Sequence, residues 1–295
     1  MATLLLTGAT GFLGSHLLKG LLRETDYDVV VLKRSTSNAF RIREELISDR
    51  IKSYDIDLIP LRQVFSQFSI DIIVHSATNY GRDNDDILEI VEANLVLPLK
   101  LLQLGAEYGL TTFINTDTVI DKNISHYSLS KNQFADWLMA YADRIKCVNL
   151  RLEHFYGAFD NNTKFTTFIV RSLLNNVKCV DLTAGEQKRH FIYIDDVTSA
   201  FMCVLKNLGS ISGCFNSFDI STEKSHTIKE FTNTAKKLAG NTLTQLNFGA
   251  LPYRDGEKMD IHTNIEPLKS LGWAPGFSLT EGLALMMQKE KESLI

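Results

Sequence analysis

Short apolar runs alternate with amphipathic segments through the first half of the chain. The runs are rich in leucine, valine and isoleucine and have the length of buried strands, at residues 3–6, 29–32, 72–74, 112–115 and 147–150. The segments between them, 12–23, 87–108 and 128–144, carry apolar residues at helical spacing. Repeated strand–helix alternation predicts an α/β fold with a doubly wound parallel sheet. Such sheets bind ligands in the crevice at the carboxyl ends of their strands.

The rhythm becomes less regular after about residue 152. The pattern predicts helices at 166–174, 196–205, 228–238 and 279–289, and strands at 191–194, 214–218 and 243–248. We expect residues 1–152 to form the first domain and residues 153–295 mainly a smaller cap, with segments near 191–218 returning to the first domain.

A glycine triplet follows the first predicted strand, in the stretch TGATGFLG at residues 7–14. Gly8 permits a sharp turn, Gly11 lets the backbone approach a pyrophosphate, and Gly14 lets the helix pack close to the strand. A turn without a ligand is the alternative. In this strand–helix context we predict a Rossmann-like dinucleotide site, with cofactor contacts from Gly8, Thr10, Gly11, Phe12, Leu13 and Gly14.

The end of the second strand indicates which dinucleotide binds. A carboxylate at this position accepts the ribose 2′-hydroxyl of NAD. Here the strand runs into Lys33, Arg34 and Ser35, two cations and a hydroxyl that suit a 2′-phosphate. We therefore predict NADPH, the alternative being that these cations are solvated loop charges.

A tyrosine and a lysine stand four residues apart, at Tyr127 and Lys131. Positions i and i+4 share one face of a helix. A tyrosine has an ordinary pKa of about 10, and a neighbouring ammonium lowers it by favouring the phenolate. Such a pair exchanges protons with a substrate oxygen. Thr116, at the predicted carboxyl end of its strand, provides a hydroxyl for the same oxygen, unless it only caps a turn.

Composition and charge exclude several classes of protein. The chain has 295 residues, is 44% hydrophobic and 22% charged, and carries a formal net charge of −4. This is typical of a globular protein and gives no basic field for nucleic acid. We expect no membrane span, no signal peptide, no metal site and four free cysteines, and hence a cytoplasmic protein.

These motifs together resemble the extended short-chain dehydrogenase/reductase family, whose members act on nucleotide-activated sugars. The likeness covers nearly the whole chain. Further matching motifs are DIIVHSA at 71–77, Asn94, residues 150–157, Arg189 with FIYIDDV at 191–197, Arg254 in YRDGE, and LGWAP at 271–275.

The resemblance implies roles for particular residues. It implies that Thr116, Tyr127 and Lys131 are catalytic. Further cofactor contacts are implied for Asp55, Ile56, Ser76, Ala77, Thr78 and Asn94. Substrate contacts are implied for Tyr80, Arg82, Thr116, His154, Lys164, Arg189 and Arg254. A homodimer is implied as well, formed by the helices at 87–108 and 128–144.

Several stretches resemble one branch of the family, the CDP-paratose and CDP-abequose synthases: residues 77–84, 151–166 and 182–191. Family dehydratases carry an Asp-Glu pair after the catalytic threonine. Here Asp117 is followed by Thr118, so we do not expect dehydration. His154 and His190 replace other residues of the family, either as substrate contacts or as ordinary partly buried imidazoles.

The expected reaction is reduction by NADPH of the C4 ketone of a nucleotide-linked 4-keto-6-deoxyhexose, with a CDP-linked sugar favoured. An NAD-dependent 4-epimerase and a non-catalytic dinucleotide sensor are the alternatives. The sequence leaves open the base of the nucleotide and the configuration of the product at C4.

Overall fold

The computed structural model describes residues 2–81 and 86–292. The chain divides into two compact units. The first consists of Met1–Leu152 and Thr198–Asp219, and the second of Glu153–Val197 and Ile220–Ile295. In the described part of the chain, no helix combines the length and the apolar character needed to cross a membrane.

A seven-stranded sheet forms the centre of the first unit, in the order β11-β6-β5-β4-β1-β2-β3. The strands are β1 (Thr3–Thr7), β2 (Asp28–Lys33), β3 (Ile51–Asp55), β4 (Ile72–His75), β5 (Thr112–Thr118), β6 (Lys146–Leu152) and β11 (Phe215–Ile220). Strands β2 and β3 extend the sheet on one side of β1. The chain then crosses over and adds β4, β5 and β6 on the other side of β1. All of these neighbouring strands pair in parallel. The point where the order reverses is where doubly wound sheets bind ligands.

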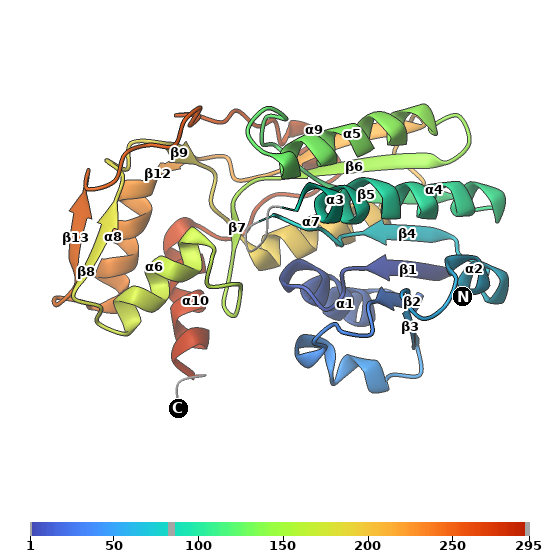
Figure 1. Cartoon of the computed structure of the whole chain (residues 1–295), viewed down its shortest axis with the longest axis horizontal. Helices are drawn as coiled ribbons and strands as arrows, with labels where there is room; N and C mark the ends of the chain where they lie inside the picture. The colour runs from blue at the N-terminus through green and yellow to red at the C-terminus, as the bar shows by residue number, and fades with distance from the viewer. Residues whose placement is uncertain (1, 82–85, 293–295) are drawn as a thin grey trace. The chain divides into compact units, whose positions relative to one another are not determined.

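Helices cover this sheet, and Figure 1 shows α3, α4 and α5 grouped beside β4, β5 and β6. The elements are α1 (Phe12–Glu24), η1 (Phe40–Ile42), η2 (Glu45–Ile47), α2 (Leu61–Gln67), α3 (Ile87–Val91), the π-helical turn η3 (Glu92–Val96), α4 (Leu97–Glu107) and α5 (His126–Ala140). Helix α7 (Ile194–Lys206) begins in the second unit and ends in the first.

One face of the sheet packs an apolar core that includes Leu5, Ile73, Phe113 and Cys147 from the strands and Phe134 from α5. Side chains two residues apart on a strand point to the same face. The next residues on that face are polar: Thr7, His75, Asn115 and Asn149, near the carboxyl ends of their strands. The apolar core therefore gives way to a buried polar row at the edge expected to bind ligands.

The second unit is built from short strands and helices. Its strands are β7 (Phe155–Tyr156), β8 (Cys179–Leu182), β9 (Lys188–Arg189), β10 (Ile192–Tyr193), β12 (His226–Thr227) and β13 (Gln245–Phe248). Its helices are α6 (Phe165–Leu174), α8 (Ile228–Ala239), α9 (Glu266–Ser270) and α10 (Leu279–Glu292). Aromatic rings fill its core, and Phe191 packs against Phe231 with ring centroids 4.3 Å apart.

The longer elements mostly agree with the pattern in the sequence, whereas one predicted strand is shorter and several elements were not predicted. The strand predicted at 191–194 is shorter: β10 covers two residues, and α7 already begins at Ile194. Strand β3, helix α2 and strand β8 were not predicted. β3 is an edge strand whose residues are largely exposed or half-buried, so its apolar signal is weak.

Candidate active site

The glycine-rich turn between β1 and α1 is shaped by close contacts that exclude side chains. Gly8 has φ +72°, and a Cβ on it would lie 2.6 Å from the backbone nitrogen of Ala77. A Cβ on Gly14 would lie 2.0 Å from the carbonyl oxygen of Gly8. The three glycines therefore hold the start of α1 against β1 and β4, as a dinucleotide site requires.

Gly11 leaves the N-terminus of α1 open to a ligand. It is the N-cap of α1, and no side chain caps this end of the helix. A Cβ on Gly11 would meet the Gly8 carbonyl oxygen at 3.2 Å, so this position tolerates a small side chain better than Gly14 does. The exposed N–H groups and the helix dipole favour a phosphate here. The residues of this turn fit the pyrophosphate of a dinucleotide.

The cations predicted to meet a 2′-phosphate lie at the end of β2, which neighbours the end of β3. Lys33 stands opposite Asp55 and forms an ion pair with it. Ser35 donates two hydrogen bonds to Asp57, from its backbone nitrogen at 2.8 Å and from its hydroxyl at 2.5 Å. These bonds hold the pKa of Asp57 below its usual value. Arg34 is exposed, and among the described residues no carboxylate pairs with its guanidinium. Arg34 is therefore the cation most available to a cofactor phosphate.

Asn94, predicted to contact the cofactor, is fully buried within η3. Its Oδ1 accepts from the Thr78 hydroxyl at 2.9 Å and from the Asn79 backbone nitrogen at 2.8 Å. Its Nδ2 donates to the Asn79 carbonyl at 2.8 Å and to the Ser130 hydroxyl at 3.0 Å. A side-chain amide has two donor hydrogens and two acceptor positions. All four are used within the protein in this structure, and these bonds hold the loop after β4 and helix α5 to η3.

Thr116 lies near the carboxyl end of β5 and is 8% exposed. Its hydroxyl oxygen is buried and has no hydrogen-bond partner among the described residues. A buried polar atom without a partner is costly, and functional sites are where this cost is commonly found. The hydroxyl is therefore available to a substrate oxygen.

Tyr127 and Lys131 lie on α5, as their spacing indicated. The Tyr127 ring packs against that of Tyr80, with centroids 4.9 Å apart and planes inclined by 35°. The two aromatic residues come from the loop after β4 and from α5, and both belong to the first unit. The structure thus brings the predicted proton donor together with a predicted sugar contact.

Lys131 is 2% exposed, an unusual environment for an ammonium group. Burial lowers its pKa to about 8, and the charge of Asp117 opposes this shift. The neighbouring His75 is fully buried, and burial together with the Lys131 charge keeps its pKa well below the usual value. His75 is therefore neutral, and Lys131 is a cation close to the point of losing its proton.

Arg189 and Arg254, two of the predicted substrate residues, belong to the second unit. Arg189 is 6% exposed and donates to the Lys258 carbonyl at 2.9 Å and to Glu257. It was predicted to bind the nucleotide, yet its guanidinium holds the loop that follows Arg254. Arg254 itself is exposed. Within this unit, the exposed Arg254 is the more accessible cation.

The histidines and Lys164 have partners in their own unit. The two ring nitrogens of His190 face the carbonyl oxygens of Thr222 and Ile261, at 2.7 and 3.2 Å. His154 Nδ1 lies 3.1 Å from Glu153, and the Lys164 ammonium lies 2.8 Å from Asp160. His190 thus tethers two loops, whereas the side chain of His154 stays partly exposed. Arg82 lies outside the described residues.

Sequence reasoning missed Asn149 and Asp57, and gave Asn115 and Asp117 no binding or catalytic role. Asn115 and Asn149 are fully or almost fully buried on neighbouring strands and bonded to each other at 2.8 Å. An amide inside an otherwise apolar strand, as in CVNLRL, is the signal that points to them.

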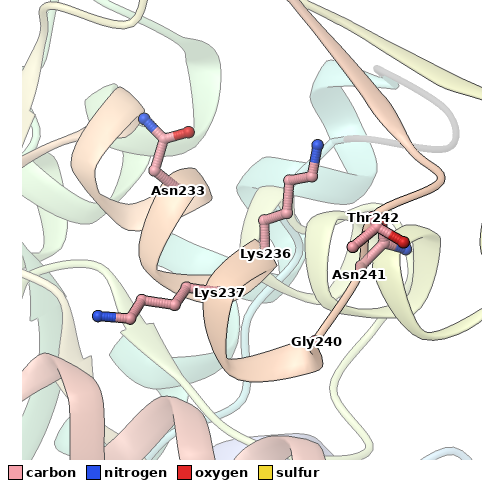
Figure 2. Close-up of a pocket in the computed structure, with 6 residues that line it drawn as sticks. All are labelled: Asn233, Lys236, Lys237, Gly240, Asn241 and Thr242. Carbon is pink, nitrogen blue, oxygen red and sulfur yellow. The ribbon is translucent and has the colours of Figure 1, made fainter.

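Figure 2 shows a shallow pocket at the carboxyl end of α8, lined by Asn233, Lys236, Lys237, Gly240, Asn241 and Thr242. The Lys236 ammonium donates to the Thr244 carbonyl at 2.7 Å, and Asn241 bonds Thr244 at its backbone nitrogen and its hydroxyl. These bonds close the turn after α8. This pocket is therefore a structural feature of that turn and contains none of the predicted site residues.

Two relatives match nearly the full length of the chain. The CDP-abequose synthase of Salmonella muenchen is 35% identical over 297 residues, covering 98% of this chain and 98% of the relative. The CDP-abequose synthase of Salmonella typhimurium is 32% identical and covers 97% of each chain.

The fold has close structural neighbours. The UDP-glucuronic acid 4-epimerase of Bacillus cereus, solved with UDP-glucuronic acid and NAD, superposes with a TM-score of 0.86 at 23% identity and covers 99% of each chain. Residues 4–216 match the NAD dependent epimerase/dehydratase family. The chain therefore belongs to this family, the extended short-chain dehydrogenase/reductases that modify nucleotide sugars.

Proposed function

We propose that the protein reduces the C4 ketone of a nucleotide-linked 4-keto-6-deoxyhexose and uses NADPH as reductant. The observation that carries this proposal is the buried Lys131 four residues after Tyr127, on a strand–helix scaffold whose Thr116 hydroxyl is unpaired among the described residues. NADPH supplies the hydride that reduces the ketone carbon. The protein supplies the proton, the orientation and the charge.

Tyr127 is the proton donor in this mechanism. It gives its phenolic proton to the oxygen that gains negative charge during reduction. The ammonium of Lys131 favours the resulting phenolate, because opposite charges attract strongly in a buried environment. The Thr116 hydroxyl donates to the same substrate oxygen and orients it. After the reaction, Tyr127 takes a proton back from solvent.

The substrate is a CDP-linked 4-keto-3,6-dideoxyhexose, and the product is CDP-paratose or CDP-abequose. Support comes from the two Salmonella relatives, both CDP-abequose synthases, which match this chain over nearly its full length. Dideoxyhexoses of this type are components of bacterial O-antigen. Arg254, which is exposed in the second unit, binds the diphosphate through charge-assisted hydrogen bonds.

The test is a direct assay with the purified chain. NADPH and CDP-4-keto-3,6-dideoxyglucose are mixed with the protein, oxidation is followed at 340 nm, and the configuration of the product at C4 is read by NMR. Tyr127→Phe should reduce kcat by about 10²- to 10⁴-fold and leave NADPH affinity intact. Tyr141→Phe makes the same chemical change beyond the end of α5 and should leave kcat unchanged. Near-normal turnover by Tyr127→Phe would contradict the mechanism.

A second candidate function is 4-epimerisation with bound NAD. Two carboxylates favour it: Asp55 neutralises Lys33, and Asp57 occupies both donors of Ser35. A site with less net positive charge suits a ribose 2′-hydroxyl better than a 2′-phosphate. NAD retained through purification, together with interconversion of a nucleotide sugar and its 4-epimer without added cofactor, would favour epimerisation over net reduction.

The protein is a homodimer in this proposal. Helices α3 and α5 expose large apolar side chains: Ile87, Leu88, Leu129, Trp137 and Met139. Apolar residues grouped on neighbouring helices are typical of a surface that a second copy covers.

A further inference from the structure

Thr7 and His75, which lie opposite each other on β1 and β4, determine which ring nitrogen of His75 carries the proton. The Thr7 hydroxyl oxygen accepts from the backbone nitrogens of Ser76 and Ala77, both at 3.2 Å. These bonds use both acceptor positions of the oxygen, so the hydroxyl donates its own hydrogen to His75 Nδ1, 2.9 Å away. Complete burial, together with the charge of Lys131, keeps the pKa of His75 well below its usual value, so the ring is neutral. The single ring proton is therefore on Nε2.

A second series of hydrogen bonds, on β5 and β6, fixes the orientation of the Asn115 amide. Asp117 accepts at both carboxylate oxygens, from the Thr118 backbone nitrogen at 2.8 Å and from Asn149 Nδ2 at 2.7 Å. Because Asn149 turns its Nδ2 to the carboxylate, its Oδ1 accepts from Asn115 Nδ2, at 2.8 Å. The amide oxygen of Asn115 is therefore left as an acceptor.

His75 and Asn115 are opposite each other on the neighbouring strands β4 and β5, and both are 0% exposed. Their Nε2 and Oδ1 atoms are buried and have no hydrogen-bond partner among the described residues. Each side chain is bonded to its outer neighbour, Thr7 on β1 or Asn149 on β6, and the two do not bond to each other. An unpaired donor thus stands beside an unpaired acceptor, and leaving both unpaired in a buried site is costly.

We propose that His75 is held as the Nε2–H tautomer, and that one buried water accepts from Nε2 and donates to Asn115 Oδ1. A water in a buried polar site commonly has two to four such partners. This water completes a chain of hydrogen bonds from Thr7 to Asp117 in which every donor points in the same direction. The chain joins the glycine-rich turn after β1 to the strand that carries Thr116. Its relevance to catalysis rests on the proposed function, and His75 is a positioning residue in it.

The first test reads the tautomer directly and needs no turnover. The full chain is labelled with ¹⁵N-histidine, and multiple-bond ¹H–¹⁵N correlation shows which ring nitrogen carries the proton. His75 is identified among the seven histidines by nuclear Overhauser contacts to Phe134, whose ring centroid lies 6.1 Å from that of His75. We expect the proton on Nε2. A proton on Nδ1 alone, or on both nitrogens, would overturn the inference.

The second test looks for the water. In the same sample, the Nε2 proton of His75 should give NOE and ROE cross-peaks of opposite sign at the water frequency, as a long-lived bound water does. A crystal structure of the full chain should show this water within hydrogen-bond distance of His75 Nε2 and Asn115 Oδ1. A direct bond between these two side chains, or an Nε2–H group without a bound water, would contradict the proposal.

A pair of variants separates the water from the tautomer. Asn115→Leu removes the acceptor, so the water cross-peak should be lost, whereas the proton should stay on Nε2 because Thr7 still donates to Nδ1. Asn233→Leu makes the same change at an exposed position of α8 and should keep both signals. A water cross-peak that survives Asn115→Leu would refute the bridge. The readings on the unmodified protein decide the inference even if Asn115→Leu does not fold.

The role of the chain in catalysis is tested separately. Asn115→Leu should lower kcat by roughly tenfold or more at a temperature where the variant is folded, because a small displacement of a group that contacts the substrate is costly. Asn233→Leu should leave kcat unchanged. An unchanged kcat in folded Asn115→Leu would refute the role in catalysis. If no keto sugar is reduced and the Nε2–H tautomer and its water are still found, the proposed function fails and the water site stands.

Discussion

Asn94 and Ser130 join the π-helical turn η3 to helix α5 at the residue before Lys131. Asn94 Nδ2 donates to the Ser130 hydroxyl at 3.0 Å, and this hydroxyl donates to the Tyr127 carbonyl oxygen at 2.8 Å. The same amide holds the loop after β4 through Asn79 and Thr78. One buried side chain thus fixes the two segments that carry Tyr80 and the Tyr127–Lys131 pair.

Asn94→Ala should therefore destabilise the fold and disturb catalysis together. The substitution leaves several buried donors and acceptors without partners, each at a cost of about 1–3 kcal/mol. We expect the free energy of unfolding to fall by roughly 2–4 kcal/mol in urea titrations. Asn123→Ala removes an exposed amide and should change it by less than about 0.5 kcal/mol. Equal, small effects of the two substitutions would show that the Asn94 network contributes little.

The glycine-rich turn offers a matched pair of substitutions. Gly14→Ala places a Cβ 2.0 Å from the Gly8 carbonyl oxygen, so the helix must move and thermal stability should fall markedly. Gly11→Ala places its Cβ at 3.2 Å from the same atom, so the fold should survive while cofactor affinity drops. Gly209→Ala, which meets nothing within 4 Å, is the control. Calorimetric binding of NADPH and melting temperatures check the pair, and full affinity in Gly11→Ala would contradict the phosphate site.

Arg34 should decide how strongly the protein prefers NADPH over NADH. Lys33 is engaged by Asp55 and Ser35 by Asp57, which leaves the Arg34 guanidinium for a 2′-phosphate. Arg34→Ala should weaken NADPH binding by roughly 10- to 100-fold and leave NADH binding unchanged, since hydrogen bonds to charged groups contribute about 1.5–3 kcal/mol. Arg43→Ala is the matched surface control. If NADPH and NADH lose affinity equally, Arg34 does not recognise the 2′-phosphate of NADPH.

Trp137 should be needed for dimerisation. Its side chain is 50% exposed on α5, and α3 exposes Leu88 to 78%. Trp137→Glu puts a charge into the proposed contact and should shift the protein to monomers in sedimentation equilibrium. Ile47→Glu, a substitution at an exposed position on η2, should leave the oligomeric state unchanged. A monomeric unmodified protein would refute the dimer.

Local pattern predicted most of the regular elements. The β1 run of leucines and the helical spacing after Phe12 can be read from neighbouring residues, because strand and helix periodicities are set within a few positions. The pattern failed where burial is partial, as in β3, and where a strand is only two residues long before a helix, as at Ile192–Tyr193.

The sequence by itself determined the parallel α/β scaffold, the glycine-rich turn and the Tyr127–Lys131 spacing, since each depends on residues close together in the chain. Only the tertiary structure decided how those residues are used. It joined Asn94 to Ser130, 36 positions apart, and Asn149 to Asp117, 32 positions apart. It also placed the Arg189 guanidinium so that it donates a hydrogen bond to the Lys258 carbonyl, in the loop that follows Arg254. Hydrogen-bond partners and charge partners are set by which strands and helices become neighbours, and no local period in the sequence encodes that.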